Sequence, residues 1–104
     1  MSEPMPITPI PAAAEGVPNF SRWESDDGYQ PVVAYLNSRW RVIECRDGIQ
    51  WILQHVDGKR HGRARWAGRS YLRTRDGLIA SCRRSLPEID PSALAILHSL
   101  PERI

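Results

Sequence analysis

Hydrophobic and polar residues alternate most regularly between residues 39 and 56, on either side of Asp47-Gly48. An Asp-Gly pair between two alternating runs is typical of a β-hairpin with a two-residue type I′ turn, in which both central residues need positive φ. Such a turn pairs residues whose numbers add up to 95. This register predicts one buried face, because it brings together the apolar residues Trp40, Val42, Ile49, Trp51 and Leu53.

The opposite face of this hairpin is predicted to be polar and exposed. It carries two arginines and two glutamines, Arg39, Arg41, Gln50 and Gln54, around a small patch formed by Ile43 and Ile52. Arginine and glutamine supply donor groups of the kinds that contact phosphates and base edges. We therefore treat this face as part of a candidate binding surface.

The remaining pattern predicts a third strand and two helices. Glycines at 58, 62 and 68 mark turns on either side of a strand near Arg63–Ala67. One helix is expected to begin at about Thr74, and a second to be capped by Asp90, with leucines at helical spacing up to residue 100. Residues 31–38 fit either a short helix or an edge strand. The predicted fold is a small α+β domain, with an antiparallel sheet of about three strands covered on one face by two C-terminal helices.

Residues 1–22 are predicted to be a disordered, proline-rich leader, and residues 23–104 a single domain. Five of the first 18 residues are proline, which removes backbone donors and favours extended chain. The leader fits a solubilising tail or a segment that docks into a partner. It lacks the basic start of a signal peptide, and the sequence lacks the roughly 18 consecutive apolar residues of a membrane helix, so we expect a cytoplasmic protein without membrane contact.

The net charge of +2 hides a strong segregation of charge along the chain. Residues 39–84 contain twelve basic and four acidic residues, whereas both flanks are acidic. Eleven of the twelve basic residues are arginine, the side chain that forks onto phosphate or carboxylate. This excess predicts a nucleic acid or an acidic protein surface as partner, although an arginine-rich composition without any ligand produces the same bias.

The candidate nucleic-acid-binding residues are Arg39, Arg41, Gln50, Gln54, Lys59, Arg60, Arg63 and Arg65. No phosphate-binding loop, nucleophile motif or pair of carboxylates points to catalysis, so we expect a protein that is not an enzyme and uses no cofactor. His55, Asp57 and His61 lie close in sequence, but the arginines around them would repel a metal ion. The two cysteines are expected to be reduced packing residues, with a single disulfide as the alternative.

The segment NSRWRVIECRDGIQWILQ, residues 37–54, resembles the core of a group of short, uncharacterised bacterial proteins from plasmids and other mobile regions. The similarity extends over about residues 37–84, and because no activity is established for that group, it transfers no functional residue. A sheet of about three strands followed by a helix at YLRTRDGL also resembles, in topology alone, the DNA-binding arm domains of phage integrases and small sheet-and-helix stress proteins. Neither resemblance implies a function. The arginine-rich central region predicts a nucleic-acid-binding role, with a protein-interaction module or inhibitor encoded on a mobile element as the alternative.

Overall fold

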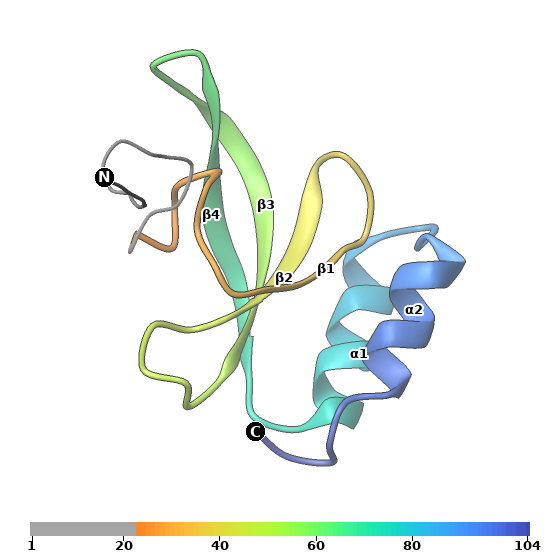
Figure 1. The fold of residues 1–104 in the computed structure, drawn as a ribbon. Helices are drawn as coiled ribbons and strands as arrows, with labels where there is room; N and C mark the ends of the chain where they lie inside the picture. The colour runs from red at the N-terminus through yellow and green to blue at the C-terminus, as the bar shows by residue number, and fades with distance from the viewer. Residues whose placement is uncertain (1–22) are drawn as a thin grey trace, which may run out of the picture.

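The computed structural model describes residues 23–104 and has an antiparallel sheet of four strands followed by two helices (Figure 1). The strands lie in chain order across the sheet: β1 (Val32–Tyr35), β2 (Trp40–Glu44), β3 (Trp51–Arg60) and β4 (Arg63–Leu72). The helices are α1 (Arg75–Ser85) and α2 (Pro91–His98). The α+β class is confirmed. The predicted strand number was too low, because residues 31–38 contain the edge strand β1; the predicted leader lies outside the described residues.

The β2–β3 register is the predicted one, from Trp40 opposite His55 to Glu44 opposite Trp51. The predicted type I′ turn is wrong, because of the two turn residues only Gly48 has positive φ. A four-residue loop joins the strands instead: Cys45 N donates to Gln50 O at 2.9 Å, and Gly48 N donates to Cys45 O at 2.9 Å. Ile49 consequently lies in the loop and is half exposed, outside the core where we expected it.

A type I′ turn does occur in the β3–β4 hairpin. His61 and Gly62 have φ values of 54° and 79°, and Arg60 pairs with Arg63 across them. Histidine is among the few residues besides glycine and asparagine that adopt positive φ readily. The two strands are longer than predicted, so that Gly58 and Gly68 lie inside strands and not in turns.

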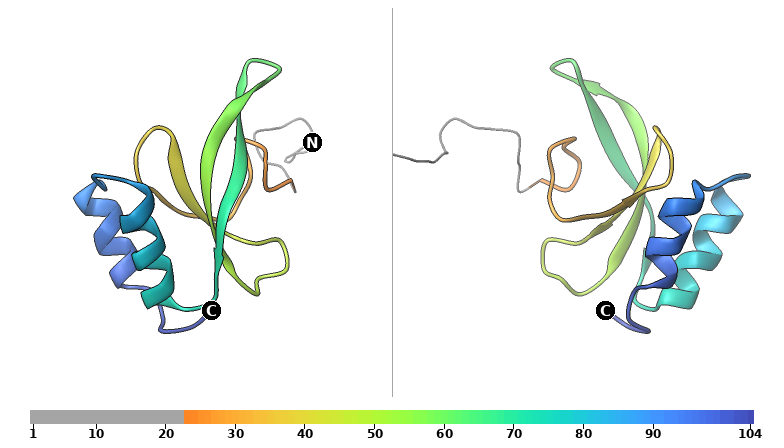
Figure 2. Two further views of the ribbon diagram at one scale, coloured as in Figure 1. Left: turned by 180° about the vertical axis from the view of Figure 1, so that it is seen from behind. Right: turned by 45° about the vertical axis from the view of Figure 1, so that its right-hand side comes forward.

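Both helices cover one face of the sheet, as predicted (Figure 2). Their buried residues pack against the predicted inner face of the hairpin in one core cluster, which includes Val42, Trp51, Leu53, Leu78, Cys82 and Leu97. The predicted caps are also present. Thr74 Oγ1 accepts a hydrogen bond from Gly77 N at 3.1 Å, and Asp90 Oδ1 accepts one from Ser92 N at 2.8 Å.

The opposite face of the sheet is covered by residues 23–30, which precede β1 (Figure 2). Tyr29 is buried there in a second apolar cluster with Ile43, Cys45 and Ile52, and its hydroxyl donates to Glu44 O at 2.8 Å. The prediction of an exposed polar face around a small patch was therefore wrong. The patch is a second core, because a segment distant in sequence closes over it.

The two cysteines are free and buried in different clusters. Cys82 belongs to the helix-side cluster and Cys45 to the cluster beneath residues 23–30. The sheet separates them, which agrees with the expected role as packing thiols. Within residues 23–104, neither helix is long and apolar enough to span a membrane.

Candidate nucleic-acid interface

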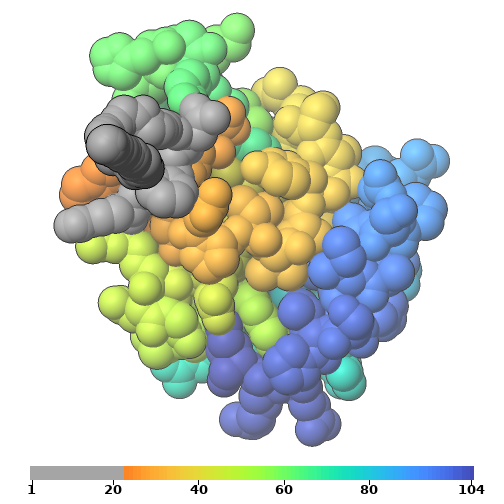
Figure 3. Space-filling model, in the orientation of Figure 1, coloured from red at the N-terminus to blue at the C-terminus, as the bar shows by residue number. Residues whose placement is uncertain are grey.

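The β3–β4 hairpin extends beyond the rest of the sheet as a two-stranded arm, which we define as residues 57–65. The last β2–β3 pair is Trp40–His55, and Arg39 O accepts a final hydrogen bond from Val56 N at 2.9 Å. Beyond that point β3 pairs only with β4. Figure 3 shows the arm, in green, standing out from the molecular surface.

Four of the predicted binding residues lie together on this arm: Lys59, Arg60, Arg63 and Arg65. All four are exposed. Arg60 lies 3.8 Å from an Asp26 carboxylate oxygen, and Arg65 lies 3.9 Å from one of Asp57. Among residues 23–104, no ion pair includes Lys59 or Arg63.

A further basic pair, Arg39 and Arg69, lies near His55 at the base of the arm. The Arg69 guanidinium lies 6.0 Å from the Trp40 ring, which in turn stacks on His55 at 4.4 Å. Desolvation lowers the pKa of His55, and the positive charges of Arg39 and Arg69 lower it further. Arg39 is exposed, and its carbonyl oxygen accepts a hydrogen bond from Val56, which directly precedes the arm. It is the one predicted binding residue outside the arm that is both exposed and close to the arm.

Arg41 is fully buried and does not belong to a surface. Its Nε donates to Gln54 Oε1 at 2.6 Å, and its Nη2 donates to the carbonyl oxygens of Glu24 at 3.0 Å and Asp26 at 2.9 Å. Nη1 adds a longer contact of 3.4 Å to Asp27 O. The prediction that Arg41 contacts a ligand is therefore corrected: its guanidinium fastens residues 23–30 to the sheet.

The same guanidinium lies 4.4 Å from the centre of the buried Trp66 ring. A cation over an aromatic face is attracted to it, and more strongly when both are desolvated. Burial lowers the pKa of Arg41, and its interactions with Tyr35 oppose that decrease. Because arginine has the highest pKa of any side chain, the group remains charged.

The two glutamines predicted to bind, Gln50 and Gln54, do not belong to the candidate interface either. Gln54 is buried, and its Nε2 donates to Glu24 O at 2.8 Å. Gln50 directly precedes β3 at the end away from the arm, nine residues from Lys59, or about 30 Å at the rise of an extended strand. The alternation of the sequence correctly assigned these side chains to one face, but it could not show that this face is covered.

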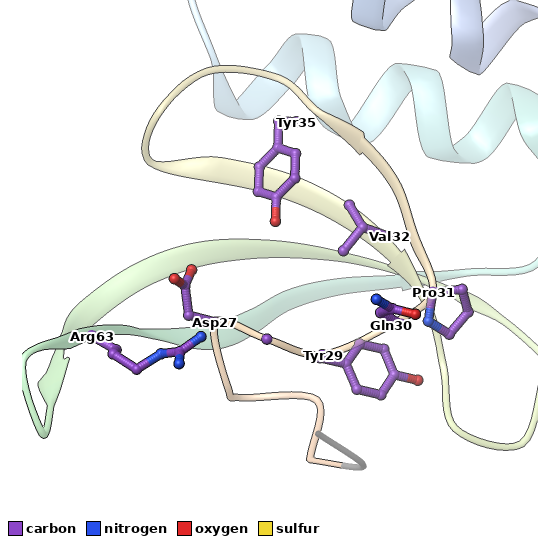
Figure 4. A pocket seen from close by; sticks show the side chains of 8 residues that line it. Asp27, Tyr29, Gln30, Pro31, Val32, Tyr35 and Arg63 are labelled. Atoms are coloured by element: carbon purple, nitrogen blue, oxygen red, sulfur yellow. The ribbon is translucent and has the colours of Figure 1, made fainter. Parts of the chain in front are cut away.

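A broad hollow of about 770 Å³ lies beside the arm (Figure 4). It is lined by residues 27–32, together with Tyr35 and Arg63. The Tyr35 side chain is half exposed, and its ring meets Trp66 edge-on at 6.2 Å. Asp27 Oδ1 accepts a hydrogen bond from Trp66 Nε1 at 3.0 Å, which holds the carboxylate at the edge of the hollow.

Arg69 was not among the predicted binding residues, and of the residues that line the hollow only Arg63 was. Arg69 reaches Trp40 at a register shift, where Leu53 pairs with Ser70 but Gln54 pairs with Gly68. Gly68 is the local signal for this bulge, since an isolated glycine inside a strand favours one, but the sequence analysis assigned it to a turn. The hollow depends on residues 27–32 meeting the arm, a contact between segments more than 30 residues apart.

Among residues 23–104, no group of three or more His, Cys, Asp or Glu side chains is placed to hold a metal ion. Comparison of the chain with protein-family models, curated proteins and solved structures finds no significant match.

Proposed function

We propose that this protein is a non-enzymatic nucleic-acid-binding protein whose β3–β4 arm contacts the phosphate backbone. The observation that carries the proposal is the concentration of Lys59, Arg60, Arg63 and Arg65 on an exposed two-stranded arm. The major groove of B-DNA is about 12 Å wide and admits a two-stranded β-ribbon. Arginine side chains on such a ribbon reach the phosphates that border the groove.

Arg39 and Arg69 extend the basic surface from the arm to its base. Both exert a positive potential at His55, which lowers the pKa of the imidazole. A bound phosphate backbone would offset these charges, and the pKa of His55 would then rise. An increase in the pKa of His55 on addition of DNA would therefore report binding at this surface in the wild-type protein.

The proposal is tested by the salt dependence of binding to a short DNA duplex. If four or five phosphates are neutralised, log affinity falls with log salt at a slope of roughly −4. Replacing Lys59 and Arg63 by glutamine should flatten this slope by about one unit per lost contact and weaken binding to all sequences alike. The measurement is fluorescence anisotropy at several salt concentrations.

The matched control removes two charges from Arg83 and Arg84, which are exposed in the last turn of α1. Helix α1 lies apart from the β3–β4 arm (Figure 1). The control variant should retain the slope of the wild type. Equal loss in both variants would indicate a response to net charge alone, and absence of binding at low salt would refute the proposal.

A second candidate is a protein-interaction module, such as an inhibitor encoded on a mobile element, that binds an acidic partner surface. The observation that favours it is that Arg60 and Arg65 already lie beside carboxylates, those of Asp26 and Asp57. A partner's carboxylates can compete for the same guanidinium groups. In that case Lys59 and Arg63 variants would lose capture of one acidic protein, while the wild type would show no duplex binding at low salt.

We also propose a cytoplasmic location for either function. Cys45 and Cys82 are both free thiols, and a reducing compartment keeps thiols in that form.

A further inference from the structure

The hollow beside the arm combines an exposed ring with polar groups that a phosphate-binding surface does not need. Its volume of about 770 Å³ is within the usual range for small-molecule sites, about 300–1,000 Å³. Figure 4 shows the Tyr35 ring on one side of it and the Asp27 carboxylate on another, with Arg63 reaching in from the arm. These groups come from β1, from residues 23–30, which we call the covering segment, and from β4.

Tyr35 is held in place without being covered. The residue is 51% exposed, yet its ring meets the buried Trp66 edge-on at 6.2 Å, and the Arg41 guanidinium lies 4.4 Å from the Trp66 ring in turn. A partly exposed ring whose position is already determined loses little freedom when a planar group stacks on it. Stacking of nucleobases on such rings is the main attractive contact in single-strand binding.

Asp27 determines what kind of group can enter. One of its carboxylate oxygens accepts from Trp66 Nε1 at 3.0 Å, and within residues 23–104 neither Asp27 nor Arg63 takes part in an ion pair. A carboxylate repels a phosphate, but it accepts a hydrogen bond from an exocyclic amino group such as cytosine N4. The hollow therefore suits a base, while the phosphates remain on the arm.

We infer that the hollow holds one unpaired nucleobase of a single strand whose phosphates lie along the arm, and that it prefers cytosine to thymine. This inference rests on the proposed function and adds single-stranded nucleic acid to the duplex as a ligand of the same basic arm. Arg63 connects the two parts, because it belongs to the arm and also lines the hollow. Thymine offers only a carbonyl oxygen at the position where cytosine has its amino group.

The experiment measures the affinity of the full chain for oligodeoxycytidylate, oligothymidylate and a duplex of equal length. Tyr35→Leu should weaken binding to the cytosine strand by about 5- to 150-fold, the effect of losing one stacked base. Tyr35→Phe, which retains the ring, should remain within about twofold of the wild type, and neither substitution should change duplex affinity. Native circular dichroism of each variant checks that the fold is intact.

Asp27→Asn is the second variant of the test. Its side-chain carbonyl oxygen can still accept the hydrogen bond from Trp66 Nε1, so the substitution changes only the group that faces the base. The wild type should bind the cytosine strand about tenfold more tightly than the thymine strand, the effect of one base-specific contact. In Asp27→Asn this preference should fall to about twofold or reverse, because the new amide donates to thymine O4. A purely structural role for Asp27 would change both affinities together and leave their ratio intact.

The outcomes separate this inference from the proposed function. Duplex binding that depends on Lys59 and Arg63, together with single-strand binding that is indifferent to Tyr35 and Asp27, would overturn the base site and leave the arm proposal standing. If neither strand nor duplex responds to Lys59 and Arg63, both are overturned.

Discussion

Replacing Arg41 by methionine should be among the most damaging single substitutions in the domain. The change removes three hydrogen bonds of 2.6–3.0 Å and leaves the buried Gln54 Oε1 without this donor. Glu24 O keeps the hydrogen bond from Gln54 Nε2, and Asp26 O keeps the one from Tyr29 N. Hydrogen bonds to a charged group contribute about 1.5–3 kcal/mol each. Relief of the cost of burying the cation offsets part of that loss, so the net destabilisation should be about 3–5 kcal/mol.

The assay is urea unfolding followed by circular dichroism and tryptophan fluorescence. A denaturant slope of about 1–1.5 kcal/mol per molar, typical of small domains, converts the expected loss into a midpoint lower by about 2–5 M. Arg39→Met is the matched control. It removes the same side chain from an exposed position two residues away and should change stability by no more than about 0.5 kcal/mol.

Arg41→Lys separates charge from geometry. Lysine retains the positive charge but presents its donors from a single nitrogen, which cannot reach Gln54 and two carbonyl oxygens as the guanidinium does. It should therefore recover only part of the stability. If the free energy of unfolding of Arg41→Met lies within 1 kcal/mol of that of the wild type, this side chain does not hold residues 23–30 on the sheet. The conclusion that Arg41 is structural is then refuted.

Three other predictions concern the core and its titrating groups. Trp51→Ala should destabilise the protein by about 3–5 kcal/mol in urea unfolding and Gln50→Ala by less than about 1 kcal/mol, because Trp51 is buried in the helix-side cluster; similar losses would contradict this packing. Burial raises the pKa of the Cys82 thiol to about 11, so the unfolded chain releases this proton first as pH rises. Stability should thus fall by on the order of 2 kcal/mol between pH 9 and 11, and Cys82→Ala should reduce that slope. The pKa of His55, which NMR titration measures, should lie below its usual value and rise in Arg39→Gln; no change would mean that Arg39 exerts no field there.

Local signals in the sequence predicted the parts of the fold that depend on local physics. The hairpin register was correct even though the turn type was wrong, because a four-residue loop that closes on the Cys45–Gln50 pair leaves the same residues opposite each other. Thr74 and Asp90 were correct because a cap depends on neighbouring residues alone.

The covering segment could not be predicted from the sequence. Alternation with a period of two assigns Arg41 and Gln54 to one face of the sheet, but it carries no information about what packs on that face. The segment that buries them lies 14–30 residues earlier, and it binds them through backbone carbonyl oxygens, which every sequence possesses. The grouping of Lys59, Arg60, Arg63 and Arg65 on one hairpin could be predicted, because residues near a tight hairpin turn are neighbours in space as well as in sequence. Their role in binding stays a prediction.

Burial and ion pairs within the domain reduce the number of basic residues that are available to a partner. Of the basic residues in the central region, Arg41 is withdrawn into the interior, and Arg60 and Arg65 lie beside the carboxylates of Asp26 and Asp57. A phosphate that contacts either paired arginine must compete with a carboxylate already present, so its gain is smaller than that of a contact with an unpaired cation. Within the described residues, Lys59 and Arg63 have no such competitor on the arm. Their two charges should therefore dominate the affinity for an anionic partner, whether that partner is a nucleic acid or an acidic protein.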